Sequence, residues 1–270
     1  MSPYRGAADP RAPDVLVCAG LDPSGGAGMI ADVRVVAELG GRPTGVVTAL
    51  TVQNTTGVVD FQACDPDLVG HQLAFLLTDV EVRAVKIGMI GSTAIAKAIA
   101  NALHLTHAPV VWDPILAPTR GNVAFADAGF AEALTALRPH LTVVTPNKQE
   151  LFQLTGLPTG NLVMAEAAGR ELAKKLDCAV LVKGGHFGGD DDDDDAIDML
   201  VTASDRNWLR GKRITGGEHV HGTGCALASA IATYLALGRE LAEACQLAKQ
   251  FVAQLIEKPA HPGRGAPAVV

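Results

Sequence analysis

A short glycine turn that leads into a helix carries the clearest chemical signal of the sequence. Residues 221–238 read HGTGCALASAIATYLALG, with a cysteine directly after the turn. The first backbone N–H groups of a helix have no partner inside the helix, so they can bind an anion. The positive end of the helix dipole also favours a thiolate over a thiol, so the cysteine could accept a proton beside that anion. The residues of this predicted anion site are Gly222, Thr223, Gly224 and Cys225.

Two other interpretations of Cys225 are open at this point. A buried cysteine is most often a small apolar filler. His219 and His221 also stand close to it, in an H-x-H spacing that would place both rings on one side of a strand. A structural zinc site has four ligands, and no fourth ligand is spaced nearby, so the sequence favours the anion site over zinc.

Polar side chains also follow several other apolar segments that have the length of strands. Asp22 lies in LDPSGG, Gln53 in VQNTTG, Asp113 in WDP and Asn147 in TPNKQE. The carboxyl ends of parallel strands meet at one edge of an open sheet, where functional residues collect. We therefore expect these side chains to surround one site together with the glycine turn.

Asn147 and Glu150 permit two interpretations. They stand three residues apart at a helix start, which is the spacing of a capping box. The same spacing places both on one face of the helix, and with Asp113 nearby their oxygens suit Mg²⁺, bound directly or through water. Lys183, which precedes two glycines, either reaches a phosphate or lies on the surface with its stem buried.

Two common nucleotide-binding motifs are excluded. Residues 26–31 fit G-x-G-x-x-A after a strand, but Gln53 and Asn54 stand where an acidic residue would bind a ribose. We therefore reject a dinucleotide site and expect Gly28 to serve a tight turn and close helix packing. No G-x-x-x-x-G-K-[ST] segment occurs, so the chain is not a P-loop NTPase.

Segments rich in Val, Ile and Leu alternate with helix-length segments along the chain. Continuous apolar strands are typical of a parallel sheet with both faces covered, so we expect an α/β fold. The chain reads as a single domain, residues 1–270, with a core at 14–257 and loose termini at 1–13 and 258–270. The expected strands are 14–20, 44–54, 84–90, 109–115, 141–147 and 178–186, with a hairpin-like pair at 196–203 and 207–214. The expected helices are 26–40, 65–80, 92–104, 127–137, 147–156, 165–177, 224–238 and 239–257.

Composition excludes several classes of protein. The net charge is −7 and no basic tract occurs, which argues against a nucleic-acid-binding surface. No apolar run could span a membrane, no signal peptide is visible, and the five cysteines form no C-x-x-C, so we expect a cytoplasmic protein with free thiols. The aspartate run at 190–195 could bind a cation, but consecutive like charges are more typical of a solvated loop.

Together these motifs resemble the hydroxymethylpyrimidine/phosphomethylpyrimidine kinases of thiamine biosynthesis, a family of the ribokinase-like superfamily. The resemblance implies a three-layer sandwich with a mostly parallel central sheet, and a homodimer. It also implies phosphorylation of 4-amino-5-hydroxymethyl-2-methylpyrimidine, and then of its monophosphate, with ATP and Mg²⁺. The segments that carry it run in order from about residue 14 to residue 257: AGLDPSGGAG, TALTVQNTTGV, VKIGMIGS, VWDPIL, VTPNKQE, LVKGGH and HGTGCALASAIA.

The resemblance also implies roles for individual residues. The turn at 222–224 would stabilise charge on the transferred phosphate, and Cys225 would accept the proton of the substrate hydroxyl. Residues on the substrate side would be Gly20, Asp22, Gln53, Met89 and Asp113. Residues on the nucleotide side would be Asn147, Glu150, Lys183 and Gly185. Mg²⁺ would be held, partly through water, by Asn147, Glu150 and Asp113.

Two positions depart from the family pattern. Ala226 stands where relatives usually carry a hydroxyl, and LAPTRGN (116–122) replaces a Lys- or Ser-containing segment, so Arg120 could supply the cation there. A pyridoxal or pyridoxine kinase is the close alternative: Gln53 favours an aminopyrimidine, whereas a histidine on the ring would favour vitamin B6. A non-catalytic pyrimidine-binding protein would have lost the anion turn, and a sugar kinase would have Asp in place of Cys225.

Overall fold

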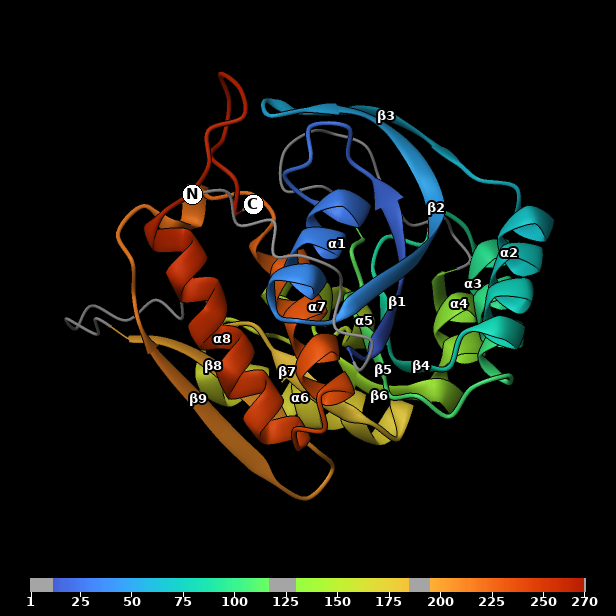
Figure 1. The fold of residues 1–270 in the computed structure, drawn as a ribbon. Coiled ribbons are helices and arrows are strands. Elements are labelled where there is room, and N and C mark those ends of the chain that lie inside the picture. The colour runs from blue at the N-terminus through green and yellow to red at the C-terminus, as the bar shows by residue number, and fades with distance from the viewer. Residues whose placement is uncertain (1–11, 117–129, 185–194, 270) are drawn as a thin grey trace.

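Strands and helices alternate through residues 12–116, 130–184 and 195–269, which the computed structural model describes (Figure 1). The strands are β1 (Asp14–Leu21), β2 (Arg42–Asn54), β3 (Gly57–Ala63), β4 (Val82–Ile87), β5 (Val110–Trp112), β6 (Leu141–Val144), β7 (Ala179–Val182), β8 (Asp195–Val201) and β9 (Arg206–Lys212). The helices are α1 (Gly28–Glu38), α2 (Pro66–Asp79), α3 (Thr93–Leu103), α4 (Phe130–Leu137), α5 (Lys148–Thr155), α6 (Leu162–Leu176), α7 (Thr223–Ala236) and α8 (Leu241–Glu257). Short 3₁₀ turns lie at η1 (Arg138–His140) and η2 (Gly217–His219).

One nine-stranded sheet has the order β3-β2-β1-β4-β5-β6-β7-β8-β9. Its central strands, from β2 to β7 in this order, pair in parallel. β3 at one edge, and β8 and β9 at the other, pair antiparallel. The α/β fold with a mostly parallel sheet, expected from the sequence, is confirmed.

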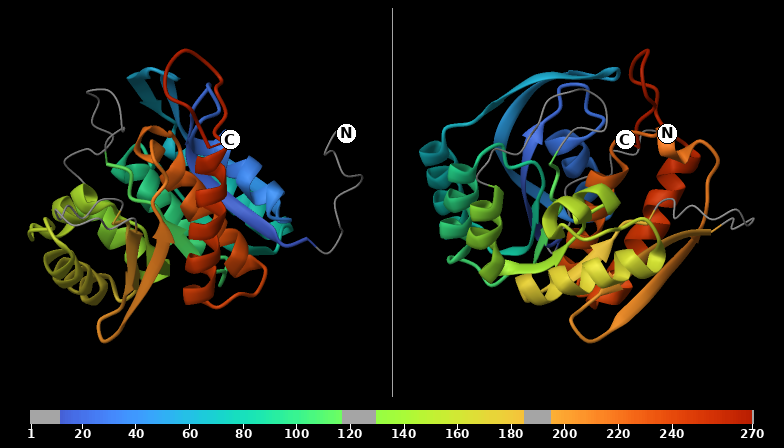
Figure 2. Two further views of the ribbon diagram at one scale, coloured as in Figure 1. Left: turned by 90° about the vertical axis from the view of Figure 1, so that its left-hand side faces the viewer. Right: turned by 180° about the vertical axis from the view of Figure 1, so that it is seen from behind.

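Helices cover both faces of this sheet because successive side chains of a strand point to opposite sides. In β1, Leu16 and Cys18 join the core beneath α2 to α6. Val15 and Val17 join the core beneath α1, α7 and α8. Figures 1 and 2 show these two helix layers from opposite sides, and they confirm the three-layer sandwich.

The helix starts follow the local sequence. The side chain of Asp65 accepts a hydrogen bond from the Leu68 N–H, and Pro66 opens α2, where its missing N–H costs nothing. Asn147 and Glu150 form a complete capping box at α5. That helix ends at Gly156, whose φ of 71° is in the left-handed region. The capping interpretation of Asn147 and Glu150 is therefore confirmed.

A buried ion pair joins the centre of the sheet to two helices. Lys86 in β4 donates from Nζ to Asp32 of α1 at 2.6 Å, and both side chains are fully buried. Ser229 of α7 donates to the other oxygen of Asp32 at 2.8 Å. Burial alone would lower the pKa of Lys86, but the carboxylates of Asp32 and Asp113 and the neighbouring Cys225 hold it above its ordinary value. The lysine therefore stays charged inside the protein.

Strand β3 was missed in the sequence analysis. It forms a hairpin with β2 at the sheet edge, and Val58 is its one buried residue while the others are exposed or half-buried, so no apolar run marks it in the sequence. The connecting turn is held by Asn54, whose side chain accepts from the N–H of Thr56 at 2.8 Å. This hairpin extends β2 beyond the parallel part of the sheet.

The expectation of a loose C-terminal segment at 258–270 was wrong. Ala260 and Ala268 exchange two backbone hydrogen bonds, of 2.8 and 2.9 Å, and Val269 is buried. The segment reads as a loop because its Pro, Gly and Ala residues carry no periodic pattern, yet its backbone is paired. Residues 1–11, Gly185, Arg120 and most of the aspartate run lie outside the described residues. Within the described parts of the chain, no helix is long and apolar enough to cross a membrane.

We expect the buried pair to be critical for stability. Lys86→Met would leave the Asp32 carboxylate buried without its cation, and the free energy of unfolding should fall by about 3–5 kcal/mol. Lys97→Met is the matched control: Lys97 pairs with Glu132 at 2.7 Å, but both side chains are mostly exposed. That change should cost less than about 1 kcal/mol. Urea denaturation of both variants would measure the difference, and equal losses would contradict the account.

Candidate active site

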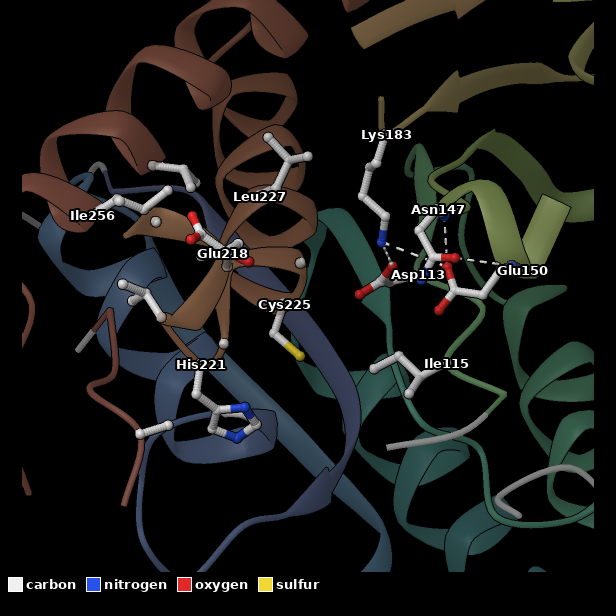
Figure 3. A pocket seen from close by; sticks show the side chains of 18 of the residues that line it. Asp113, Ile115, Asn147, Glu150, Lys183, Glu218, His221, Cys225, Leu227 and Ile256 are labelled. Carbon is white, nitrogen blue, oxygen red and sulfur yellow. Dashed lines mark hydrogen bonds and ion pairs between the residues drawn. The ribbon is translucent and has the colours of Figure 1, made fainter. Parts of the chain in front are cut away.

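An open cleft of about 1560 Å³ lies where the carboxyl ends of the parallel strands meet the first turn of α7. It is lined by nearly all of the described residues that the sequence analysis proposed for the site. Figure 3 shows Cys225 and His221 on one side, and Lys183, Asp113, Asn147 and Glu150 on the other. The proposed residues that line it are Gly20, Asp22, Gln53, Met89, Asp113, Asn147, Glu150, Lys183, Gly222, Thr223, Gly224 and Cys225.

The glycine turn forms because two backbone segments approach closely. Gly222 is the N-cap of α7 with a φ of 86°, a left-handed conformation that glycine adopts readily. A Cβ atom at Gly222 would lie 2.0 Å from the carbonyl oxygen of Gly26. Gly28 has a φ of 58°, and its Cβ would lie 2.3 Å from the carbonyl oxygen of Gly20. The expectation that Gly28 serves a tight turn and close packing is confirmed.

Cys225 lies in the first turn of α7, buried at the floor of the cleft. Burial raises the pKa of its thiol to about 11, while the nearby Lys86 ammonium and a backbone hydrogen bond from Gly28 act in the opposite direction. The sequence left this pKa open, and in the structure the loss of hydration outweighs the effect of Lys86. At neutral pH the thiol is the favoured form.

Asp22 organises the loop between β1 and α1. Its carboxylate accepts from the N–H and hydroxyl of Ser24 at 2.8 and 2.7 Å, and from the N–H of Ala27 at 3.0 Å. Burial would raise the pKa of Asp22, but hydrogen bonds from His221 and Ser24 lower it below its ordinary value. Asp22 is therefore a charged group that shapes the wall of the cleft.

Gln53 contacts His221, which directly precedes the first turn of α7. Gln53 Nε2 lies 3.2 Å from His221 Nε2, and Gln53 Oε1 accepts from the Thr51 hydroxyl at 3.3 Å. His221 Nε2 also lies 3.6 Å from Asp22 Oδ2. The Thr51 hydroxyl also donates to the carbonyl of Leu21 at 2.8 Å. On the apolar side, a Cβ at Gly20 would lie 2.9 Å from the sulfur of Met89, so the two pack tightly.

The zinc interpretation finds no support. His219 lies in η2 with its side chain 68% exposed and pairs with Glu218. His221 contacts Asp22 and Gln53 instead. Within the described residues, no group of three or more His, Cys, Asp or Glu side chains could hold a metal ion by itself.

A charged cluster occupies the opposite wall. Lys183 donates to Asp113 Oδ1 at 2.7 Å and lies 3.7 Å from Glu150 Oε2 (Figure 3). Asp113 Oδ1 also accepts from the Thr145 hydroxyl at 3.0 Å. The Lys183 side chain is only 17% exposed, so the interpretation as a surface lysine was wrong. Burial would lower the pKa of Lys183, but the carboxylates of Asp113 and Glu150 outweigh it and raise that pKa.

At Gly224 the first turn of α7 comes close to the Lys183–Asp113 pair on the opposite wall of the cleft. A Cβ atom at this position would lie 3.3 Å from Lys183 Nζ and 3.5 Å from Asp113 Oδ2. The N-terminal turn of α7 therefore faces the Lys183 ammonium directly, with no side chain between them. Backbone N–H groups, a helix dipole and a buried ammonium converge on one space, which suits a phosphate group.

Two residues of the site were missed or misread from the sequence. Lys86 lines the cleft beneath Cys225, and its one signal was a charge inside the apolar strand segment AVKIGMI. His221 was considered only as a metal ligand, although it stands directly before the glycine turn. Its contact with Gln53 joins positions 168 residues apart, which no local pattern reveals.

Alkylation of Cys225 offers a direct check of its protonation. Because burial raises the pKa to about 11, its reaction with iodoacetamide should keep rising by about tenfold per pH unit from pH 7 to 10. Peptide mass spectrometry would follow this residue separately from the other cysteines. The urea-unfolded chain is the control, and its rate should level off near the ordinary thiol pKa of about 8.5. A plateau below pH 8 in the folded protein would contradict the assignment.

Comparison with known proteins agrees with this geometry. Residues 22–269 match the family described as phosphomethylpyrimidine kinase. A hydroxymethylpyrimidine/phosphomethylpyrimidine kinase of Streptomyces coelicolor is 38% identical over 89% of this chain and 87% of its own. The thiamine biosynthesis bifunctional protein ThiED of Geobacter sulfurreducens is also 38% identical, over 93% of this chain and 50% of its own.

Solved kinase structures also superpose on this chain over most of its length. The crystal structure of a phosphomethylpyrimidine kinase from Clostridium difficile superposes with a TM-score of 0.76 at 30% identity, covering 91% of this chain and all of that one. A pyridoxal kinase from Staphylococcus aureus in complex with AMP-PCP and pyridoxal gives a TM-score of 0.82 at 29% identity, covering 95% and 92%. The match over residues 22–269, together with the 38% identity to the S. coelicolor kinase over most of both chains, shows that this chain belongs to the phosphomethylpyrimidine kinase family.

Proposed function

We propose that this protein transfers the γ-phosphate of ATP to the hydroxymethyl group of 4-amino-5-hydroxymethyl-2-methylpyrimidine, and then phosphorylates the monophosphate to the pyrophosphate. The observation that carries the proposal is the turn at 222–225, which faces Lys183 across one cleft. Phosphoryl transfer depends on positioning and charge neutralisation more than on covalent chemistry. A homodimer and a cytoplasmic location, expected from the sequence and the resemblance, remain part of this proposal.

The pyrimidine would bind between Gln53 and the wall formed by Gly20 and Met89. An amide can donate and accept at once, which matches the amino group and ring nitrogen of an aminopyrimidine. Thr51 and His221 both contact the Gln53 amide, so its position is set before a substrate arrives. Such pre-organisation lowers the entropic cost of binding.

The phosphates of ATP would lie between the α7 turn and Lys183. Mg²⁺ bound with ATP would neutralise charge on the phosphates. The carboxylates of Asp113 and Glu150 line this part of the cleft and are oxygen donors of the kind Mg²⁺ prefers, most readily through water because Lys183 already contacts both. Asn147 contributes chiefly by capping α5 and so holding Glu150 in place.

Cys225 would accept the proton of the substrate hydroxyl. Only the thiolate form can accept this proton, and the raised pKa makes that form a small fraction at neutral pH. The thiolate would become a thiol as the substrate oxygen bonds to phosphorus and the bond between that phosphorus and ADP breaks. In a loose transition state the bond to the leaving group is largely broken before the new bond forms, so the hydroxyl proton need not be removed early. The nearby Lys86 ammonium would stabilise the thiolate before it takes the proton, since it lowers the pKa that burial raises.

A vitamin B6 kinase is the second candidate, and two observations favour it. The S. aureus pyridoxal kinase complex superposes closely on this chain. His221 also lines the substrate end of the cleft, where a histidine would suit a pyridine ring. The pyrimidine remains the first choice because Gln53 also lines this end of the cleft, and its amide can both donate to and accept from an aminopyrimidine.

Turnover of three substrates would decide between the candidates. With ATP and Mg²⁺, we expect ADP release with hydroxymethylpyrimidine and with its monophosphate, and slow release with pyridoxal. Activity on pyridoxal and the free pyrimidine, without activity on the monophosphate, would instead identify a vitamin B6 kinase. No turnover of any of the three would overturn the proposal.

The variant Cys225→Ala, measured in the same assay, tests the proposed role of Cys225 as the proton acceptor. Loss of the proton acceptor should lower kcat by about a hundredfold or more. Calorimetric binding of the free pyrimidine should remain, because Gln53 and Asp22 are untouched. An unchanged kcat would remove the proposed role of Cys225 while leaving the substrate assignment in place.

A further inference from the structure

The segment after α8 returns to the mouth of the cleft as a closed loop, which ends near the C label in Figure 1. Ala260 N–H donates to Ala268 at 2.8 Å, and Ala268 N–H donates back to Ala260 at 2.9 Å. This pairing closes residues 260–268 into a loop without a regular element. Three residues of this segment are buried although their side chains are small: Ala266, Ala268 and Val269. We call residues 260–269 the C-terminal strap.

The strap is bonded to the residue that begins the glycine turn. His221 N–H donates to the carbonyl of Pro267 at 2.7 Å, and Val269 N–H donates to the carbonyl of His221 at 3.1 Å. The His221 backbone is therefore held on both sides by the strap. Its ring then lies against Gln53 and Asp22, as described above.

The strap is bonded equally closely to the hairpin turn after β2. Ala266 N–H donates to the carbonyl of Thr55 at 2.8 Å, and Gly265 N–H donates to the Thr55 hydroxyl at 3.0 Å. Thr55 stands two residues after Gln53, at the tip of the β2–β3 hairpin. A Cβ atom at Gly265 would lie 2.0 Å from the Thr55 carbonyl oxygen, so any larger residue must push the two apart.

Small residues allow the strap to lie this close to the site. Ala268 is 1% exposed, and its Cβ would lie 3.2 Å from a Cβ added at Gly26. A Cβ added at Gly222 would lie 3.2 Å from a methyl group of Val269. Ala266 itself lines the cleft. The strap is thus part of the wall at the substrate end and not a distant tail.

We infer that the C-terminal strap positions Gln53 and His221 for substrate recognition, by tying the hairpin turn at Thr55 to the start of the glycine turn at His221. The inference rests on the proposed function, since it assigns the strap to the pyrimidine end of the cleft. Gly265, Ala266 and Thr55 act here as positioning residues. Together the backbone bonds of the strap join two segments whose side chains also meet through Gln53 and His221.

Gly265→Val tests the inference in the full-length protein. The added side chain should displace Thr55 and with it Gln53, which should raise KM for hydroxymethylpyrimidine by about tenfold or more. KM for ATP should stay within about twofold, because the atoms nearest to a Cβ added at Gly265 belong to Thr55 and Thr56 and not to the turn at 222–225. Arg264→Ala is the matched control, since Arg264 is exposed and adjacent in the chain, and its kinetics should equal those of the original protein.

A gentler pair of variants covers the case in which Gly265→Val does not fold. Thr55→Val removes the hydroxyl that accepts from Gly265 and should raise KM for the pyrimidine about three- to tenfold. Thr55→Ser keeps that hydroxyl and should restore KM. Equal rises in KM for pyrimidine and ATP, or no rise in either Thr55→Val or Gly265→Val, would overturn the inference. Lack of pyrimidine turnover in the original protein would instead overturn the proposed function.

Discussion

The site depends on the close approach of two backbone segments, the loop after β1 and the first turn of α7. Gly222 lies so near the Gly26 carbonyl, and Gly28 so near the Gly20 carbonyl, that any Cβ atom would clash. This contact places the N-terminus of α7 at the carboxyl ends of the parallel strands, where its N–H groups face Lys183. Without it, the helix would still cover the sheet, but its dipole and donors would not reach the space where a phosphate can lie.

Buried charge then decides the chemistry of that space. Lys86 stays protonated because Asp32 lies 2.6 Å away inside the core, and Lys183 because Asp113 and Glu150 flank it. The ammonium groups of Lys86 and Lys183 are thus each paired with protein carboxylates. This pairing offsets the cost of removing the two charges from water. Cys225 lies between these effects: burial keeps it a thiol, and Lys86 lowers the cost of its losing a proton. The Lys183 ammonium and the first turn of α7 are thus arranged to stabilise negative charge on a transferred phosphate.

Much of this could be predicted from the sequence, for physical reasons. Apolar strands, helix caps and left-handed glycines are local signals, so the parallel sheet, the capping box at Asn147 and the turn at Gly222 were all foreseen. Features that depend on distant partners were not. The burial of Lys86 needs Asp32 from another element, and the pKa of Cys225 depends on hydration rather than on the helix alone. The C-terminal strap has no periodic pattern, and its order comes from backbone bonds to His221 and Thr55.

The most direct test of the central claim is the turnover of Gly224→Ala. Alanine suits the helix, but its methyl group would stand about 3.3 Å from Lys183 Nζ, in the space assigned to the transferred phosphate. We expect kcat to fall by about a hundredfold or more, with the melting temperature and calorimetric affinity for the free pyrimidine nearly unchanged. An unchanged kcat would contradict the claim that the first turn of α7 and Lys183 together hold the transferred phosphate.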